Sequence, residues 1–203
     1  MNVGQFRELL QTSTDAELIT ACLHDDSVPF VFEPQPATWD SFRDELVGGL
    51  EIAHGDIRVV GSARFGFSMN PGHALRGFSD TSDIDLVVVN PHAFDRLWLA
   101  LLAAAYPRAP NVQLLGGWLR KRRNEVYTGW LTPLAIRLDS SIVGAKARPA
   151  LEFTAQWFNT LKKASRHPPR RHEEITGRLY RSWEHAELYH MHSLAALRKA
   201  LSE

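Results

Sequence analysis

Residues 56–68 read Asp-Ile-Arg-Val-Val-Gly-Ser-Ala-Arg-Phe-Gly-Phe-Ser, and residues 82–90 read Ser-Asp-Ile-Asp-Leu-Val-Val-Val-Asn. Each stretch contains a short, β-branched apolar run, Ile57–Val60 in the first and Ile84–Val89 in the second. Runs of this length and composition are typical of buried strands. The first run ends in a Gly-Ser pair and the second begins at Asp-x-Asp, so the sequence predicts two strands that carry polar groups at their ends.

Asp83 and Asp85 are two residues apart, and side chains at that spacing on a strand point to the same face of a sheet. Ile84, between them, faces the other way into a core. Two carboxylates that converge on one point repel each other unless a cation lies between them. Hard oxygen ligands with open positions suit Mg²⁺ that also holds a substrate phosphate.

Gly61 and Ser62 predict the other half of the same site. A glycine lets the backbone pass close to a ligand, and Ser62 adds a hydroxyl group. A helix that begins after this pair would offer unpaired N–H groups to phosphate oxygens. Arg64 is placed to reach a phosphate, although a solvated arginine is the simpler reading. Together these features predict a cradle for a nucleoside triphosphate.

Gly61-Ser62, then Gly66, then Asp83-x-Asp85 at the start of an apolar strand resemble the signature of the DNA polymerase β-type nucleotidyltransferase superfamily, in a small prokaryotic-type member. The resemblance implies a mixed α/β core and the transfer of a nucleoside monophosphate from an NTP to an acceptor. It also implies that Asp83 and Asp85 are catalytic residues that bind Mg²⁺ or Mn²⁺. The acceptor could be an RNA or tRNA end, a protein hydroxyl, a small molecule or another nucleotide.

Members of this family usually carry a third carboxylate on a later strand, as a metal ligand or as the base for the acceptor hydroxyl. Asp139, which follows an apolar run in Ala-Ile-Arg-Leu-Asp, is the predicted third catalytic residue. Glu125 is a poorer choice because it follows a basic run. A chain with only two carboxylates could bind Mg-NTP without transferring the nucleotide, so a binding module in a toxin–antitoxin or phage-defence pair is the main alternative.

The apolar periodicity predicts how the rest of the chain is organised. Residues 1–145 are expected to form the nucleotidyltransferase-like domain, with short helices over residues 3–24 packed on it. Residues 146–203 are expected to form a helical C-terminal region, because apolar side chains recur at helical spacing over 150–161 and again from near Glu173 to Leu201. The predicted fold class is α/β with a mixed sheet.

Arg178 and His185 fall at an Arg-x6-His spacing on that last predicted helix, and Arg181 lies one turn before His185. This spacing resembles the Arg/His motif of helical ribonuclease modules of the HEPN type. The second alternative is therefore a metal-independent ribonuclease.

The composition limits partners and location. With 23 basic and 23 acidic residues, the formal net charge is zero, so any nucleic-acid binding must come from local patches such as Arg120–Arg123 or Lys162–His172, both of which also read as solvated surface. The one cysteine, Cys22, excludes an internal disulfide and fits a reducing cytoplasm. The most apolar run, Leu97–Ala105, is too short to span a bilayer, so no membrane contact is expected. A protein partner remains open.

Overall fold

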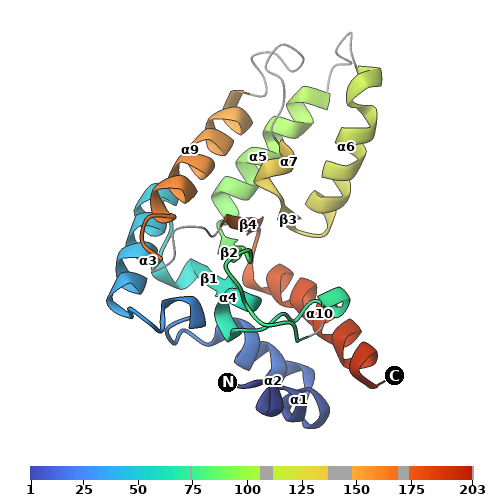
Figure 1. The fold of residues 1–203 in the computed structure, drawn as a ribbon. Coiled ribbons are helices and arrows are strands. Elements are labelled where there is room, and N and C mark those ends of the chain that lie inside the picture. Colours follow the sequence, from blue (N-terminus) through green and yellow to red (C-terminus); the bar gives the residue numbers. More distant parts are fainter. Residues whose placement is uncertain (74, 106–111, 137–147, 169–173, 203) are drawn as a thin grey trace.

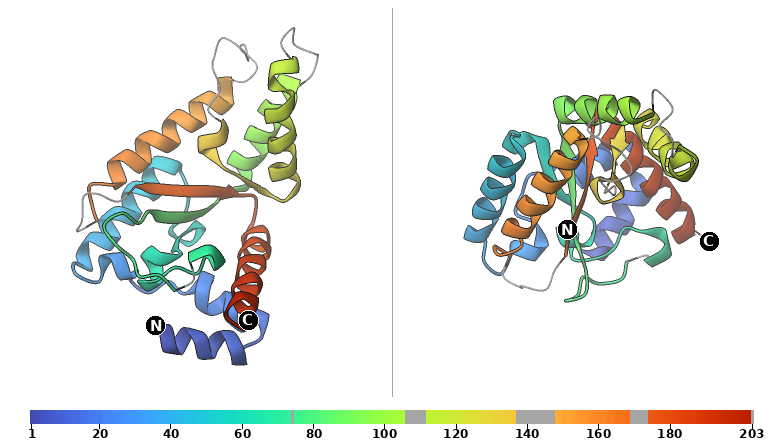
Figure 2. Two further views of the ribbon diagram at one scale, coloured as in Figure 1. Left: turned by 45° about the vertical axis from the view of Figure 1, so that its right-hand side comes forward. Right: turned by 90° about the horizontal axis from the view of Figure 1, so that it is seen from above.

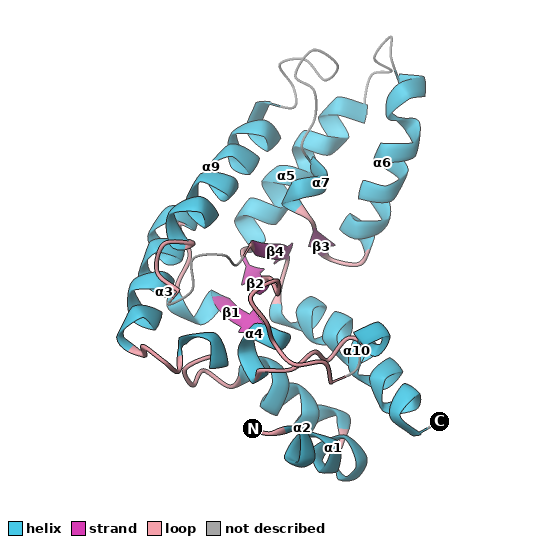
Figure 3. Ribbon diagram, viewed as in Figure 1, coloured by secondary structure: helices cyan, strands magenta, loops and turns pink. Residues whose placement is uncertain are grey.

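The computed structural model describes residues 1–73, 75–105, 112–136, 148–168 and 174–202. In these residues four strands form one mixed sheet in the order β1-β2-β4-β3 (Figure 3). β1 pairs antiparallel with β2, β2 pairs parallel with β4, and β4 pairs antiparallel with β3. The predicted mixed α and β architecture is therefore confirmed. The strands are β1 (Ile57–Val60), β2 (Ile84–Val89), β3 (Trp130–Leu131) and β4 (Ile175–Tyr180).

Short helices at the N-terminus were predicted over residues 3–24, and they are present. Asn2 and Thr14 begin α1 (Val3–Thr12) and α2 (Asp15–Ile19), each with a capping box in which the cap side chain accepts a backbone N–H three residues on. A π-helical turn, η1 (Thr20–His24), follows α2 directly. Cys22 lies in this turn and is buried.

The other helices connect and cover the strands. No helix among the described residues combines the length and the apolar character needed to cross a bilayer. Their bounds are η2 (Phe30–Phe32), α3 (Ala37–Leu50), η3 (His54–Asp56), α4 (Ser62–Phe65), η4 (Pro71–His73), α5 (Pro91–Ala105), α6 (Val112–Tyr127), α7 (Pro133–Ile136), α9 (Arg148–Ala164) and α10 (Trp183–Ser202).

The sheet lies between two groups of helices (Figures 1 and 2). Helices α3, α5 and α9 pack on one face, where alternate residues of the strands, such as Leu86 and Leu179, enter the larger apolar cluster. Helices α1, α2 and α10 cover the other face, where Val87 and Tyr180 belong to a second cluster. Each strand therefore supplies side chains to both sides of the molecule, as the period of two requires.

The expectation of a helix over residues 175–180 is wrong. These residues form β4, which pairs with β2 along its whole length, and α10 begins only at Trp183. Gly177 lies so close to β2 that an added Cβ would stand 3.1 Å from the Leu86 carbonyl oxygen. Pairing with β2 therefore outweighs the helical spacing of the apolar residues, and the region after residue 145 contributes a strand to the shared sheet.

Candidate functional site

The Gly61-Ser62 pair forms the turn between β1 and α4. Gly61 has φ +67° and ψ −145°, a conformation that residues with a Cβ rarely adopt. A Cβ built on Gly61 would stand 3.6 Å from Oδ2 of Asp85, so the turn lies against the carboxylate. Because α4 has only four residues, the polar groups available here are the turn backbone and the Ser62 hydroxyl rather than the end of a long helix.

Asp83 and Asp85 lie at the start of β2, as predicted. Asp85 stands between Val60 of β1 and Thr176 of β4 in the sheet register, and the Thr176 hydroxyl donates a hydrogen bond of 2.5 Å to its Oδ1. The pKa of Asp83 is raised above 3.8, first by burial and then by the negative charges of Asp85 and Glu174. The two predicted carboxylates are thus part of a larger acidic group, and this group favours a cation.

Glu174 was not predicted as a site residue. It comes directly before β4, and its backbone carbonyl accepts a 2.7 Å hydrogen bond from the N–H of Ile84. Because β2 and β4 are parallel with Ile84 opposite Ile175, Glu174 reaches the sheet level with Asp83. A sequence signal was present, because Ile175, Gly177 and Leu179 alternate with Thr176 and Arg178, and such alternation is typical of a strand. The prediction of a helix over this region did not take it into account.

The donor set fits Mg²⁺ in part. Asp83 and Asp85 supply carboxylate oxygens on one face of β2, which is the kind of ligand that Mg²⁺ prefers. Within the described ranges no three His, Cys, Asp or Glu side chains are grouped closely enough to hold a metal ion by themselves. Substrate phosphate oxygens and water would therefore have to complete the coordination. Asp139, the predicted third carboxylate, lies outside the described residues.

A cavity of about 450 Å³ brings several of the predicted residues together. Gly61 and Ser62 lie on its wall together with Asp83 and Asp85, and the loop between them contributes His73 and Arg76. Helix α10 closes the cavity with Tyr189, His190 and Ser193. We call this hollow the large cavity.

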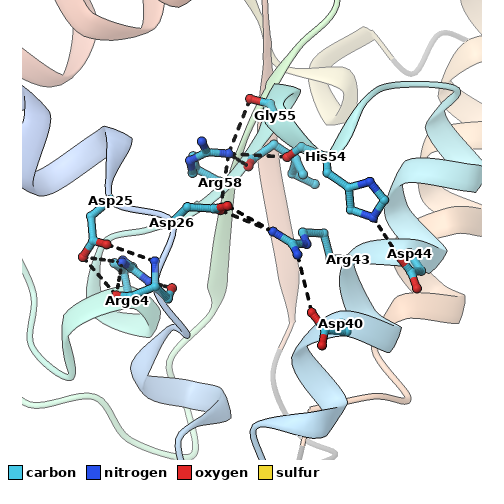
Figure 4. A network of polar contacts seen from close by, with 11 residues as sticks. Asp25, Asp26, Asp40, Arg43, Asp44, His54, Gly55, Arg58 and Arg64 are labelled. Carbon is cyan, nitrogen blue, oxygen red and sulfur yellow. Dashed lines mark hydrogen bonds and ion pairs between the residues drawn. The ribbon is translucent and has the colours of Figure 1, made fainter.

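Arg64 is not brought to this cavity. Arg64 is 7% exposed, and its guanidinium forms an ion pair of 2.6 Å with Asp25 and donates to the backbone carbonyl and hydroxyl of Ser27 (Figure 4). The neighbouring Asp26 pairs in the same way with Arg43 at 3.2 Å and with Arg58 at 3.6 Å. Arg64 therefore ties the segment after η1 to α4, and it lines a separate hollow.

The Arg/His pair of the ribonuclease reading is not on one helix. Arg178 is in β4, whereas His185 is in α10, where its Nδ1 lies 2.7 Å from the hydroxyl of Ser182. The prediction that Arg178 and His185 share one helix is therefore wrong.

The basic patches differ in exposure. In α6, Arg122 is 6% exposed and forms an ion pair of 2.6 Å with Glu125, whereas Arg120, Lys121 and Arg123 are exposed. Glu125 thus forms a largely buried ion pair within α6, and it does not line the large cavity. In the second patch, residues 169–172 lie outside the described ranges.

Comparison with known proteins adds no relative: no family model, no curated protein and no solved structure matches this chain.

Proposed function

We propose that this protein is a Mg²⁺-dependent nucleotidyltransferase that moves a nucleoside monophosphate from an NTP to an acceptor hydroxyl. The observation that carries the proposal is the content of the large cavity. A glycine-serine turn, two cationic or polar loop residues and two carboxylates all line one hollow of about 450 Å³. That volume lies in the range of small-molecule sites. The turn suits hydrogen bonds to phosphate oxygens, the loop residues suit the negative charge of the phosphates, and the carboxylates suit a metal ion.

Each group has a defined task in the proposal. The Ser62 hydroxyl and the turn backbone at Gly61 hydrogen-bond the β- and γ-phosphate oxygens, and His73 and Arg76 lie where they can contact the same triphosphate. Asp83 and Asp85 hold the metal ion, which when bound neutralises charge on the phosphates. Thr176 fixes one oxygen of Asp85 by its hydrogen bond, so the carboxylate is oriented before substrate binds.

The transfer step follows from this arrangement. The acceptor oxygen forms a bond to the α-phosphorus, the bond from that phosphorus to the bridging oxygen of the β-phosphate breaks, and pyrophosphate leaves. The acceptor proton goes to a carboxylate, for which Glu174 at the edge of the acidic group is our candidate. This is the role for which the sequence had suggested Asp139.

The test uses purified protein with each α-labelled NTP in turn, Mg²⁺ and a bacterial lysate as the pool of acceptors. We expect label on one class of acceptor with the wild type and none with the double variant Asp83→Asn/Asp85→Asn. Asp44→Asn, which removes an exposed carboxylate on α3 remote from the cavity, is the matched control and should label as the wild type does. Equal labelling by the double variant would refute the proposal.

Binding separates the transferase from the main alternative, a nucleotide-binding module. Mg-ATP affinity is measured for the same proteins by calorimetry. Tight Mg-ATP binding by the wild type, lost in the double variant and accompanied by no labelling of any acceptor class, would favour the binding module.

A further inference from the structure

A second hollow, of about 130 Å³, adjoins the large cavity and is called here the small cavity. The two cavities share Asp85, Val60, Arg178 and His190 in their walls. The Gly61-Ser62 turn borders only the large cavity, whereas Glu174 and Thr176 border only the small one. Two spaces therefore meet at one carboxylate, one on the β1 side of β2 and the other on the β4 side.

Arg178 is held in a fixed place in this wall. Its guanidinium carbon lies 5.4 Å from the ring centre of Trp130 and 4.8 Å from that of Tyr189, so two aromatic rings flank the cation. Among the described residues Arg178 has no carboxylate within ion-pair distance, and the nearby Glu125, whose pKa is raised by burial, pairs with Arg122 instead. Its Nε is buried without a hydrogen-bond partner in that part of the chain.

His190 supplies a second nitrogen of the same kind. Its Nε2 is buried and lacks a hydrogen-bond partner among the described residues. Burial and the charge of Arg178 lower the pKa of His190 to about 4, so the ring is neutral at pH 7 and can still donate one hydrogen bond. Buried nitrogens without partners are rare and costly in proteins, and here both belong to residues that line the cavities beside Asp85.

We propose that Arg178 and His190 form a subsite for a phosphate group of the acceptor, in the small cavity on the β4 side of Asp85. The inference rests on the proposed function, which places the NTP phosphates on the Gly61-Ser62 side and leaves the β4 side for the second substrate. A guanidinium and an imidazole N–H can both donate to the oxygens of one phosphate. A hollow of about 130 Å³ admits such a group with a few attached atoms rather than a whole nucleotide.

The experiment titrates inorganic phosphate into the full-length protein saturated with Mg²⁺ and α,β-methylene-ATP, which cannot transfer its nucleotide. We expect phosphate to bind without displacing the analogue, and Arg178→Gln to weaken phosphate binding at least about tenfold. Arg178→Lys should restore part of the affinity, because it retains the charge but not the planar donors. Arg181→Gln, at an exposed arginine paired with Asp95, is the matched control and should leave phosphate binding unchanged.

His190→Phe provides an independent readout if Arg178→Gln does not fold. It keeps a ring in the wall, removes the donor, and should weaken phosphate binding about threefold or more. Unchanged phosphate affinity in the folded variants would overturn the subsite, as would phosphate that only competes with the nucleotide analogue. Tighter binding of acetate than of phosphate would overturn the assignment to a phosphate group.

The titration is repeated without nucleotide so that the two proposals fail separately. Phosphate binding that depends on Arg178 in a protein with no affinity for the Mg²⁺-nucleotide analogue would refute the donor site and retain the anion site. Nucleotide binding with no Arg178-dependent phosphate binding would refute the subsite alone.

Discussion

The two faces of the sheet differ although the same strands make both. On the face under α3, α5 and α9, Ile84, Leu86 and Val88 are all 2% exposed or less and join a continuous apolar core. On the other face, Asp83 and Asp85 are exposed at the start of the same strand. One face of β2 is therefore apolar along its whole length, whereas the other carries the acidic group where the strand begins and the buried Val87 and Val89 of the second cluster after it.

The largest loss of stability is expected from a substitution in the apolar face. Leu86→Ala removes a buried side chain and should lower the free energy of unfolding by roughly 2–5 kcal/mol. Asp85→Asn, the neighbouring residue on the opposite face, should change it by less than about 1 kcal/mol. Urea denaturation of both variants measures the difference, and equal losses would mean that the Asp85 carboxylate stabilises the fold as much as the buried Leu86 side chain does.

A second prediction concerns the role of Glu174 on the acidic face. Glu174→Gln keeps the size of an exposed side chain but removes its capacity to take a proton, so nucleotide transfer should fall roughly 10²-fold. The affinity for Mg-ATP should stay within about threefold, because Glu174 does not line the large cavity. Single-turnover kinetics test this, with Glu152→Gln on α9 as the control, and an unchanged rate would remove Glu174 from the reaction.

The close approach of β4 to β2 gives a third, smaller effect. In Gly177→Ala the new Cβ would stand 3.1 Å from the Cβ and carbonyl oxygen of Leu86 and 3.2 Å from Cζ2 of Trp157. The strands must separate slightly, which should cost roughly 1–3 kcal/mol of stability. Thermal unfolding measures the loss, and a variant as stable as the wild type would show that Leu86 and Trp157 can move to accommodate the added Cβ without cost.

The smallest effect concerns pH. The pKa of Asp83 is raised in the folded state, so the folded protein binds more protons than the unfolded chain between pH 3.8 and that raised value. The contribution of Asp83 to stability is present at low pH and is lost as the pH rises through the raised pKa. Asp83→Asn should therefore be more stable than the wild type at pH 7, with a difference that shrinks as the pH falls.

Melting temperatures of Asp83→Asn and the wild type between pH 3 and 8 provide the check. Because Asp83 is exposed, added salt should reduce the difference. A variant that is less stable than the wild type at pH 7 would show that the folded protein stabilises the ionised carboxylate of Asp83 instead of opposing its charge.

Local pattern was sufficient for several elements. Ile57–Val60 and Ile84–Val89 are strands with the predicted bounds. A short run rich in β-branched residues favours a buried strand by its composition and length alone. The position of Asp83 and Asp85 at the start of β2, and of Gly61 in a turn, followed from the same local rules.

Local pattern failed where a segment depends on a distant partner. Ile175–Tyr180 carries apolar residues at spacings that fit a helix as well as a strand, and pairing with β2, some ninety residues earlier, selects the strand. Arg64 shows the same limit, since nothing near it in the sequence reveals that Asp25 and Ser27 hold its guanidinium.

The sequence by itself determined the two strands, the glycine-serine turn and the pair of carboxylates, because these depend on residues close together in the chain. Only the tertiary structure decided that β4 lies beside β2, and with it the places of Glu174, Thr176 and Arg178 around Asp85. The physical reason is that sheet pairing joins segments far apart in the chain, and no local propensity states which strand will be the neighbour.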